Sequence, residues 1–118
     1  GAVSGSSRAV YTGMIRISND APKSEAHQTN RILKLSEKAW AESVPNLEIL
    51  HNDVICSHAS AVGPIDDDQR FYLESRGVPP ERTEKLVVQG FLASRTQAIP
   101  HEGLAAYVVG RITGRLAL

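Results

Sequence analysis

The sequence has little of several features that would indicate a particular class of protein. It contains one cysteine, so no disulfide can form within the chain, and a reducing compartment such as the cytoplasm is expected. Lysine plus arginine equal aspartate plus glutamate at 13 each, which gives no reason to expect a nucleic acid or an anionic membrane as partner. No apolar run approaches the roughly 20 residues of a membrane-spanning helix. No glycine-rich phosphate loop indicates a nucleotide site.

The start of the chain also lacks an initiator methionine and the basic and apolar segments of a signal peptide. We therefore expect a piece of a longer protein. The 118 residues suffice for one domain. About 42% of them are hydrophobic but only 5% are aromatic, so the core is expected to consist of aliphatic and small side chains.

The character of the sequence changes near Pro64. Before it, β-branched and alternating residues predict four short strands, over residues 8–17, 27–35, 42–50 and 53–62. The links are too short for the crossover helix of a βαβ unit, which leaves an antiparallel meander or a few coils of a β-solenoid. We expect Pro45 near a strand start or a sheet edge, and Gly13 at a bulge or a close backbone approach.

After Pro64 the pattern is helical. Asp66 or Asp67 can cap a first helix, because Gln69 follows Asp66 at the spacing of a capping box, and Gly77 suits a left-handed position after that helix. A second helix is expected over residues 80–94, with Pro80 in its first turn. Four residues are expected on one of its sides: Leu86, Val87, Gly90 and Phe91.

A third helix is expected to begin at Pro100. Apolar residues recur there at every fourth position and form a stripe that we expect to pack on the other two helices. The stripe consists of Leu104, Val108, Ile112 and Leu116. Arg111 and Arg115 lie off this stripe and are expected in water.

Cys56 and His58 are the residues most suited to chemistry. Side chains alternate along a strand, so these two share one face of the strand over residues 53–62. Both faces of that strand carry small or apolar residues, which suits a strand that is covered on both sides. His27, His51 and His101 have no metal-binding spacing and are expected at the surface.

Three interpretations of this pair stay open on chemistry alone. A cysteine nucleophile with a histidine base would need the two groups within hydrogen-bond reach, which neighbours on one strand rarely achieve. Thiolate and imidazole also suit zinc or iron, but two ligands are too few for a closed site, so a partner chain would have to complete it. The third interpretation is a buried cysteine beside a hydrogen-bonded histidine.

Several motifs follow one another over residues 45–77: P-x-LEI, ND-V-x-CSHA, Gly63, an acidic turn and FYL-x-SRG. Their order and spacing resemble the SufB/SufD family, which belongs to the SUF iron–sulfur cluster assembly machinery. The resemblance extends over about residues 8–92, and the CSH motif makes it SufD-like. In the last helix only generic helical features match.

This resemblance implies a mostly β fold with C-terminal helices. The last coils of a right-handed parallel β-helix would occupy residues 1–63, and a small helical domain residues 64–118. It implies a non-catalytic scaffold subunit that pairs with a SufB-like subunit and docks a SufC-like ATPase. A nascent iron–sulfur cluster would form transiently at the SufB interface, near Cys56 and with His58 as metal ligand. The isolated chain would bind no cofactor tightly.

The FYL-x-SRG helix would supply the contact with the SufC-like subunit. Phe71 and Tyr72 are adjacent, so a helix spreads the cluster over more than one face, and Arg76 would add polar specificity. Two alternatives remain: a plain interaction domain without metal chemistry, and an enzyme that depends on Cys56. Because most of the family's β-helix is absent, exposed strand edges favour a homodimer of the isolated chain or capping by the helices.

Overall fold

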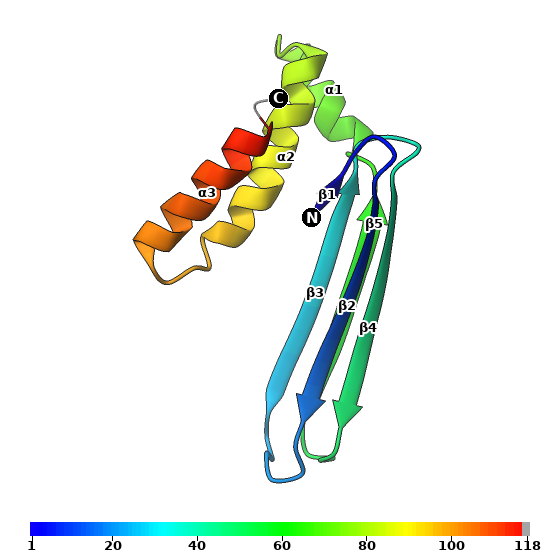
Figure 1. The fold of residues 1–118 in the computed structure, drawn as a ribbon, viewed down its shortest axis with the longest axis vertical. Coiled ribbons are helices and arrows are strands. Elements are labelled where there is room, and N and C mark those ends of the chain that lie inside the picture. The colour runs from blue at the N-terminus through cyan, green and yellow to red at the C-terminus, as the bar shows by residue number, and fades with distance from the viewer. Residues whose placement is uncertain (117–118) are drawn as a thin grey trace. The chain divides into compact units, whose positions relative to one another are not determined.

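The computed structural model describes residues 1–116, except for the side chain of Leu116, the last member of the predicted stripe, which lies outside the described residues. The described part contains five strands and three helices (Figure 1). The strands are β1 (Ala2–Val3), β2 (Arg8–Ile17), β3 (Glu25–Lys34), β4 (Trp40–Ile49) and β5 (Ile55–Gly63). The helices are α1 (Asp67–Ser75), α2 (Pro80–Thr96) and α3 (Glu102–Leu116). The strands lie in one compact unit, Gly1–Pro64, and the helices in a second that begins at Ile65.

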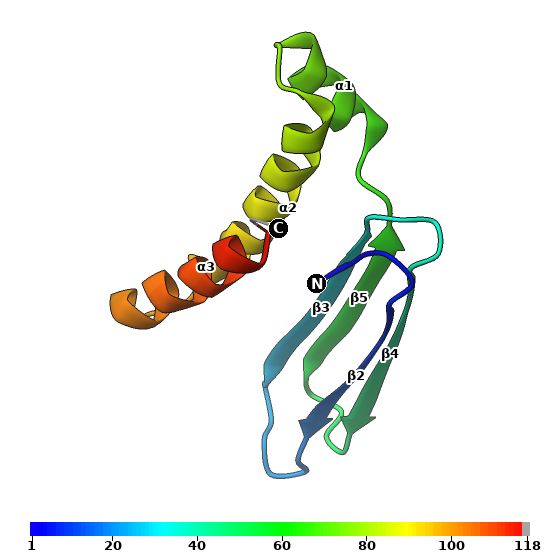
Figure 2. The same cartoon turned by 45° about the horizontal axis from the view of Figure 1, so that its top comes forward.

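All strand pairs are parallel, and they form two sheets with the orders β1-β3-β5 and β2-β4. Successive long strands therefore alternate between the sheets, and β2 to β5 run side by side in both views (Figures 1 and 2). Arg8 pairs with Trp40, 32 residues further on, and Glu25 with Ile55, 30 residues further on. The antiparallel meander is thus wrong. A helix is not needed between parallel neighbours, because each connection contains a whole strand of the other sheet.

The predicted strand spans are largely confirmed. Strand β2 has the predicted bounds, and the other three differ from theirs by no more than two residues. Strand β1 was not predicted, because two residues carry no periodicity. Pro45 lies within β4, where its missing N–H is tolerated, since β4 pairs only with β2 among the described strands and so lies at a sheet edge.

The space between the two sheets is partly polar. The buried apolar side chains of this unit are Ile17, Ile32 and Ala39. Beside them, the Gln28 side chain of β3 crosses toward β2 and lies against Gly13, where an added Cβ would overlap the Gln28 amide. The close approach predicted for Gly13 is therefore confirmed, and the group that approaches is a side-chain amide.

Strand β5 is more exposed than the sequence suggested. Ile55 is 62% and Val62 39% exposed, and only Cys56 and Gly63 are partly covered. The expectation of a strand covered on both sides is wrong for the described chain. The sheet order contributes to this exposure, since β5 is the last strand beside β3 and its side chains have no neighbouring described strand beyond that edge.

Local signals correctly placed the first helix. The Asp66 carboxylate accepts a hydrogen bond from the Gln69 backbone N–H at 2.9 Å, which caps α1. Gly77 follows the helix with φ of +87°, the left-handed conformation that glycine adopts without a steric penalty. Both predictions are confirmed.

The packing of the other two helices was predicted less well. Pro80 begins α2 as expected. The most fully buried residues of α2 are Val88 and Thr83, and neither belongs to the predicted set. Leu86 and Gly90, which do belong to it, are exposed. In α3, Leu104 is 51% exposed, so the prediction that it packs on the other helices is wrong.

The middle of the α3 stripe is better covered. Val108 and Ile112 are half-buried, and Arg111 and Arg115 are exposed as expected. Among the described residues, no helix combines the length and the apolar character that crossing a membrane would require.

Candidate functional site

Cys56 and His58 lie on the face of β5 that is turned toward the other sheet. In the parallel ladder Cys56 is the partner of Ala26, and His58 is the partner of Gln28. Paired residues of neighbouring strands point to the same side of a sheet. Gln28 points toward β2, because its Nε2 donates to the Tyr11 hydroxyl at 2.9 Å. The thiol and the imidazole therefore share the inner face, as the alternation predicted.

The two groups are unequally accessible. Cys56 is half-buried and free of any disulfide, whereas His58 is exposed. No cluster of three or more histidine, cysteine, aspartate or glutamate side chains suited to a metal ion occurs within residues 1–116. The pair offers one soft and one borderline donor, which fits iron or zinc chemically but supplies only part of a coordination shell.

The opposite face of β5 carries a network that the sequence did not reveal. His27 Nδ1 lies 2.7 Å from Ser57 Oγ, and His27 Nε2 lies 3.0 Å from the Glu25 carboxylate. All three side chains are exposed. His27 and Ser57 are partners in the β3–β5 ladder, so this cross-strand contact favours the observed register. The pairing joins residues 30 positions apart, and no local pattern indicates it.

The remaining histidines have local structural roles. His51 Nδ1 accepts a hydrogen bond from the Asp53 backbone N–H at 3.0 Å, and His101 Nδ1 accepts one from the Leu104 N–H at 3.2 Å in the first turn of α3. His27 and His101 are exposed as predicted, and His51 is half-buried.

The first helix carries an exposed aromatic cluster. Phe71 is 73% and Tyr72 59% exposed, while Leu73 is half-buried, so the cluster spreads over more than one face of α1. The Arg76 guanidinium lies 5.5 Å from the centre of the Tyr72 ring, within the range of a cation–π interaction. An exposed aromatic side chain beside an arginine is the composition that interface hot spots favour.

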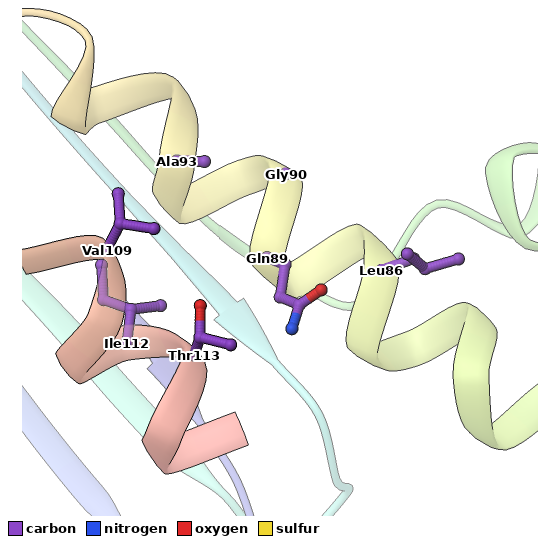
Figure 3. Close-up of a pocket in the computed structure, with 7 residues that line it drawn as sticks. All are labelled: Leu86, Gln89, Gly90, Ala93, Val109, Ile112 and Thr113. Carbon is purple, nitrogen blue, oxygen red and sulfur yellow. The ribbon is translucent and has the colours of Figure 1, made fainter. Parts of the chain in front are cut away.

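A groove separates the middle of α2 from α3. It encloses about 420 Å³ (Figure 3). The residues that line it are Leu86, Gln89, Gly90 and Ala93 from α2, and Val109, Ile112 and Thr113 from α3. Leu86 and Gly90 lie on one side of α2, as predicted. That side borders the open groove.

Comparison with known families decides what kind of chain carries this site. Residues 1–91 match the family model described as "SUF system FeS cluster assembly, SufBD core domain". The chain belongs to the SufBD family. The resemblance to this family that the CSHA and FYL-x-SRG motifs carry is therefore confirmed.

Individual SufBD relatives agree with this assignment. The chain is 40% identical over 114 residues to the iron–sulfur cluster assembly protein SufD of Escherichia coli (strain K12), covering 97% of this chain and 27% of that protein. It is 40% identical over 112 residues to SufD of Bacillus subtilis (strain 168), with 95% and 26% covered. It is also 30% identical over 111 residues to the chloroplastic protein ABCI7 of Arabidopsis thaliana, with 94% and 23% covered. The chain thus spans about a quarter of the length of these relatives.

Proposed function

We propose that the chain is the part of a SufD-like, non-catalytic scaffold subunit that presents His58 to a nascent iron–sulfur cluster. The observation that carries this proposal is the position of Cys56 and His58 together on the inner face of β5, a strand that no further described strand covers. An incomplete ligand set at an uncovered strand suits a site that a second subunit completes. The cluster is the cargo of this site, and the isolated chain holds none tightly.

The parallel ladders support a β-helical architecture for this subunit. Two strands per repeat, with about 30 residues between paired positions, are what stacked coils of a β-helix would produce. In this proposal the uncovered edge of β5 meets a SufB-like subunit. The same edges can pair two copies of the isolated chain, and a solution mass of twice the chain's 12.8 kDa would reveal that homodimer. A reducing compartment, the cytoplasm for a bacterial chain, suits a free thiol beside iron.

The scaffold role is tested by reconstitution with a SufB-like subunit, iron and a sulfide source. The change is His58→Ala, and the expected result is a loss of at least about tenfold in cluster yield, because an imidazole donor is removed. Visible absorbance and bound iron are the measurements. Ser57→Ala is the matched control, since Ser57 lies on the opposite face of the same strand. An unchanged cluster yield for His58→Ala, with correct folding and partner binding, would favour a plain interaction domain.

Thiol reactivity separates the scaffold from an enzyme that depends on Cys56. The scaffold predicts that Cys56 is alkylated no faster than an unactivated thiol, whereas an activated nucleophile reacts far faster at neutral pH because it is already a thiolate. The measurement is the pH dependence of the alkylation rate of the native chain. A high rate that persists below neutral pH would contradict the scaffold proposal and support the enzyme.

We assign the docking of a SufC-like ATPase to Phe71, Tyr72 and Arg76 on α1. The two aromatic rings are exposed although they are among the largest apolar groups in the chain, which is the property of a surface that a partner covers. Phe71→Ala is expected to weaken binding of the ATPase by at least about tenfold, as hot-spot truncations do. Tyr107→Ala is the control, because Tyr107 is a similarly exposed aromatic on α3. Equal effects of the two substitutions in a titration would contradict the assignment.

A further inference from the structure

The inner face of the strand unit contains a buried polar atom without a partner. The Oε1 atom of Gln28 is inaccessible to solvent and has no hydrogen-bond partner among the described residues. The other end of the same amide is satisfied, because Nε2 donates to the Tyr11 hydroxyl. A buried carbonyl that loses its hydrogen bonds to water is costly, so an unpaired one calls for an explanation.

Two residues of β2 define the position of this amide. Gly13 leaves the space that the amide occupies, and an added Cβ there would overlap its Nε2 and approach its Cδ. Tyr11 holds the nitrogen from the opposite sheet. Gly13 and Tyr11 thus define where the amide lies, and its Oε1 atom is left without a hydrogen-bond donor among the described residues.

His58 is the residue of the neighbouring strand that lies in register with Gln28 and carries a hydrogen-bond donor. Within its sheet, Gln28 has β5 on one side, and the residue of β5 in register with it is His58. On its other side β3 pairs with β1 only at Leu33 and Lys34. The imidazole of His58 is exposed, and no hydrogen bond to it occurs in the described structure, so neither ring nitrogen is committed to another partner there.

We propose that the side-chain carbonyl of Gln28 accepts a hydrogen bond from the imidazole of His58 and thereby orients the ring. One ring nitrogen then carries the proton and faces Gln28, and the other presents its lone pair away from β3. Metal-binding histidines commonly donate their second ring N–H to an oxygen in this way, which fixes the tautomer. Gln28 is thus a positioning residue for His58, and its role in cluster assembly rests on the proposed function.

The test reads the tautomer of His58 directly, without a partner or a cluster. The native chain is labelled with ¹⁵N at histidine, and the imidazole nitrogen shifts and two-bond couplings are recorded at alkaline pH, where imidazole is neutral. We expect one tautomer to dominate in the native chain and a mixture in Gln28→Ala. Asn30→Ala is the matched control, because Asn30 is another inward-facing amide of β3, bonded to Ser43 and in register with Ser60.

A conservative variant fixes the direction of the bond. Gln28→Glu keeps an acceptor and removes the amide donor, so it should retain the dominant tautomer of the native chain. A reversed tautomer in Gln28→Glu would overturn the proposed direction. The same tautomer population in native, Gln28→Ala and Asn30→Ala chains would overturn the proposal, as would equal changes in the two alanine variants.

The outcome is distinguishable from that of the proposed function. If His58→Ala abolishes cluster formation while Gln28→Ala leaves the tautomer unchanged, the scaffold role stands and the positioning role of Gln28 is refuted. If Gln28 controls the tautomer but His58→Ala leaves cluster yield unchanged, the hydrogen bond is real and the role of His58 as a ligand is refuted. Far-ultraviolet circular dichroism of every variant verifies that the strands still form.

Discussion

The strand unit and the helical unit depart from the usual distribution of polar and apolar groups in opposite ways. Between its sheets the strand unit places side-chain amides, Gln28 bonded to Tyr11 and Asn30 bonded to Ser43. On its surface the helical unit places some of the largest apolar side chains of the chain, Phe71 among them. Buried polar groups and exposed aromatic groups both cost stability or solubility, so each is informative about function.

Under the proposed function, the difference between the units corresponds to two kinds of interaction. The polar inner face of the strand unit, which carries Cys56 and His58, suits metal binding. The exposed aromatic rings beside Arg76 suit the binding of a protein partner. The units also differ in how their structure is specified. The strand unit depends on pairs about 30 residues apart, and the helical unit depends on caps and short-range contacts.

The largest expected effect tests the close packing of the strand unit. Gly13→Ala should lower the free energy of unfolding by up to about 3 kcal/mol, because the new Cβ forces the Gln28 amide out of its place and away from the Tyr11 hydroxyl. Gly63→Ala is the control, since a Cβ at that position meets open space, and it should change stability by less than about 0.5 kcal/mol. Denaturant unfolding monitors both. Equal stabilities of the two variants would mean that the interior of the strand unit is not tightly packed.

A smaller effect is expected from the core of the helical unit. Val88→Ala should cost about 2 kcal/mol, because it removes two buried methyl groups and leaves a cavity beneath α2. Val109→Ala removes the same groups from a residue that is 38% exposed at the groove, and it should cost no more than about 0.5 kcal/mol. Thermal unfolding followed by helical circular dichroism compares the two. A larger loss at Val109 than at Val88 would contradict a helical unit whose stability depends mainly on Val88.

The smallest effect concerns the local signals of the helical unit. Asp66→Ala should lower stability by about 1 kcal/mol, because the Gln69 N–H loses its acceptor at the start of α1. Asp68→Ala keeps that cap and removes only a favourable charge in the first turn, so its effect should be smaller. Hydrogen exchange of the first-turn amides of α1 measures both. Unchanged protection in Asp66→Ala would contradict a structure specified by its cap.

The extent to which the sequence predicted the structure follows the same division. Asp66, Gly77 and the bounds of β2 were predictable, because caps, left-handed turns and β-branched runs act over a few residues. The strand partners were not predictable from the spacing of the strands. Each strand pairs with the next strand but one, so the distance between successive strands does not reveal the repeat. Val88 is buried and Leu86 is not, because burial depends on how the helices pack. The periodicity of apolar residues within one helix carries no information about that packing.

The candidate site was predicted in part for the same reason. Alternation along one strand was enough to place Cys56 and His58 on one face, and the CSHA motif was enough to indicate the family. The neighbours of the pair come from other strands. Neither the contact between His27 and Ser57 nor the position of Gln28 beside His58 could be predicted before the register of β3 and β5 was known.

The central claim is that the imidazole of His58 binds a cluster that a second subunit completes. Pulsed electron paramagnetic resonance tests this claim most directly. The chain would carry ¹⁵N-labelled histidine, the SufB-like partner would be unlabelled, and the reconstituted complex would be reduced to make its cluster paramagnetic. The account predicts a ¹⁵N hyperfine coupling that disappears in His58→Ala and persists in His27→Ala. A cluster without that coupling in the native complex, or one whose coupling survives in His58→Ala, would contradict it.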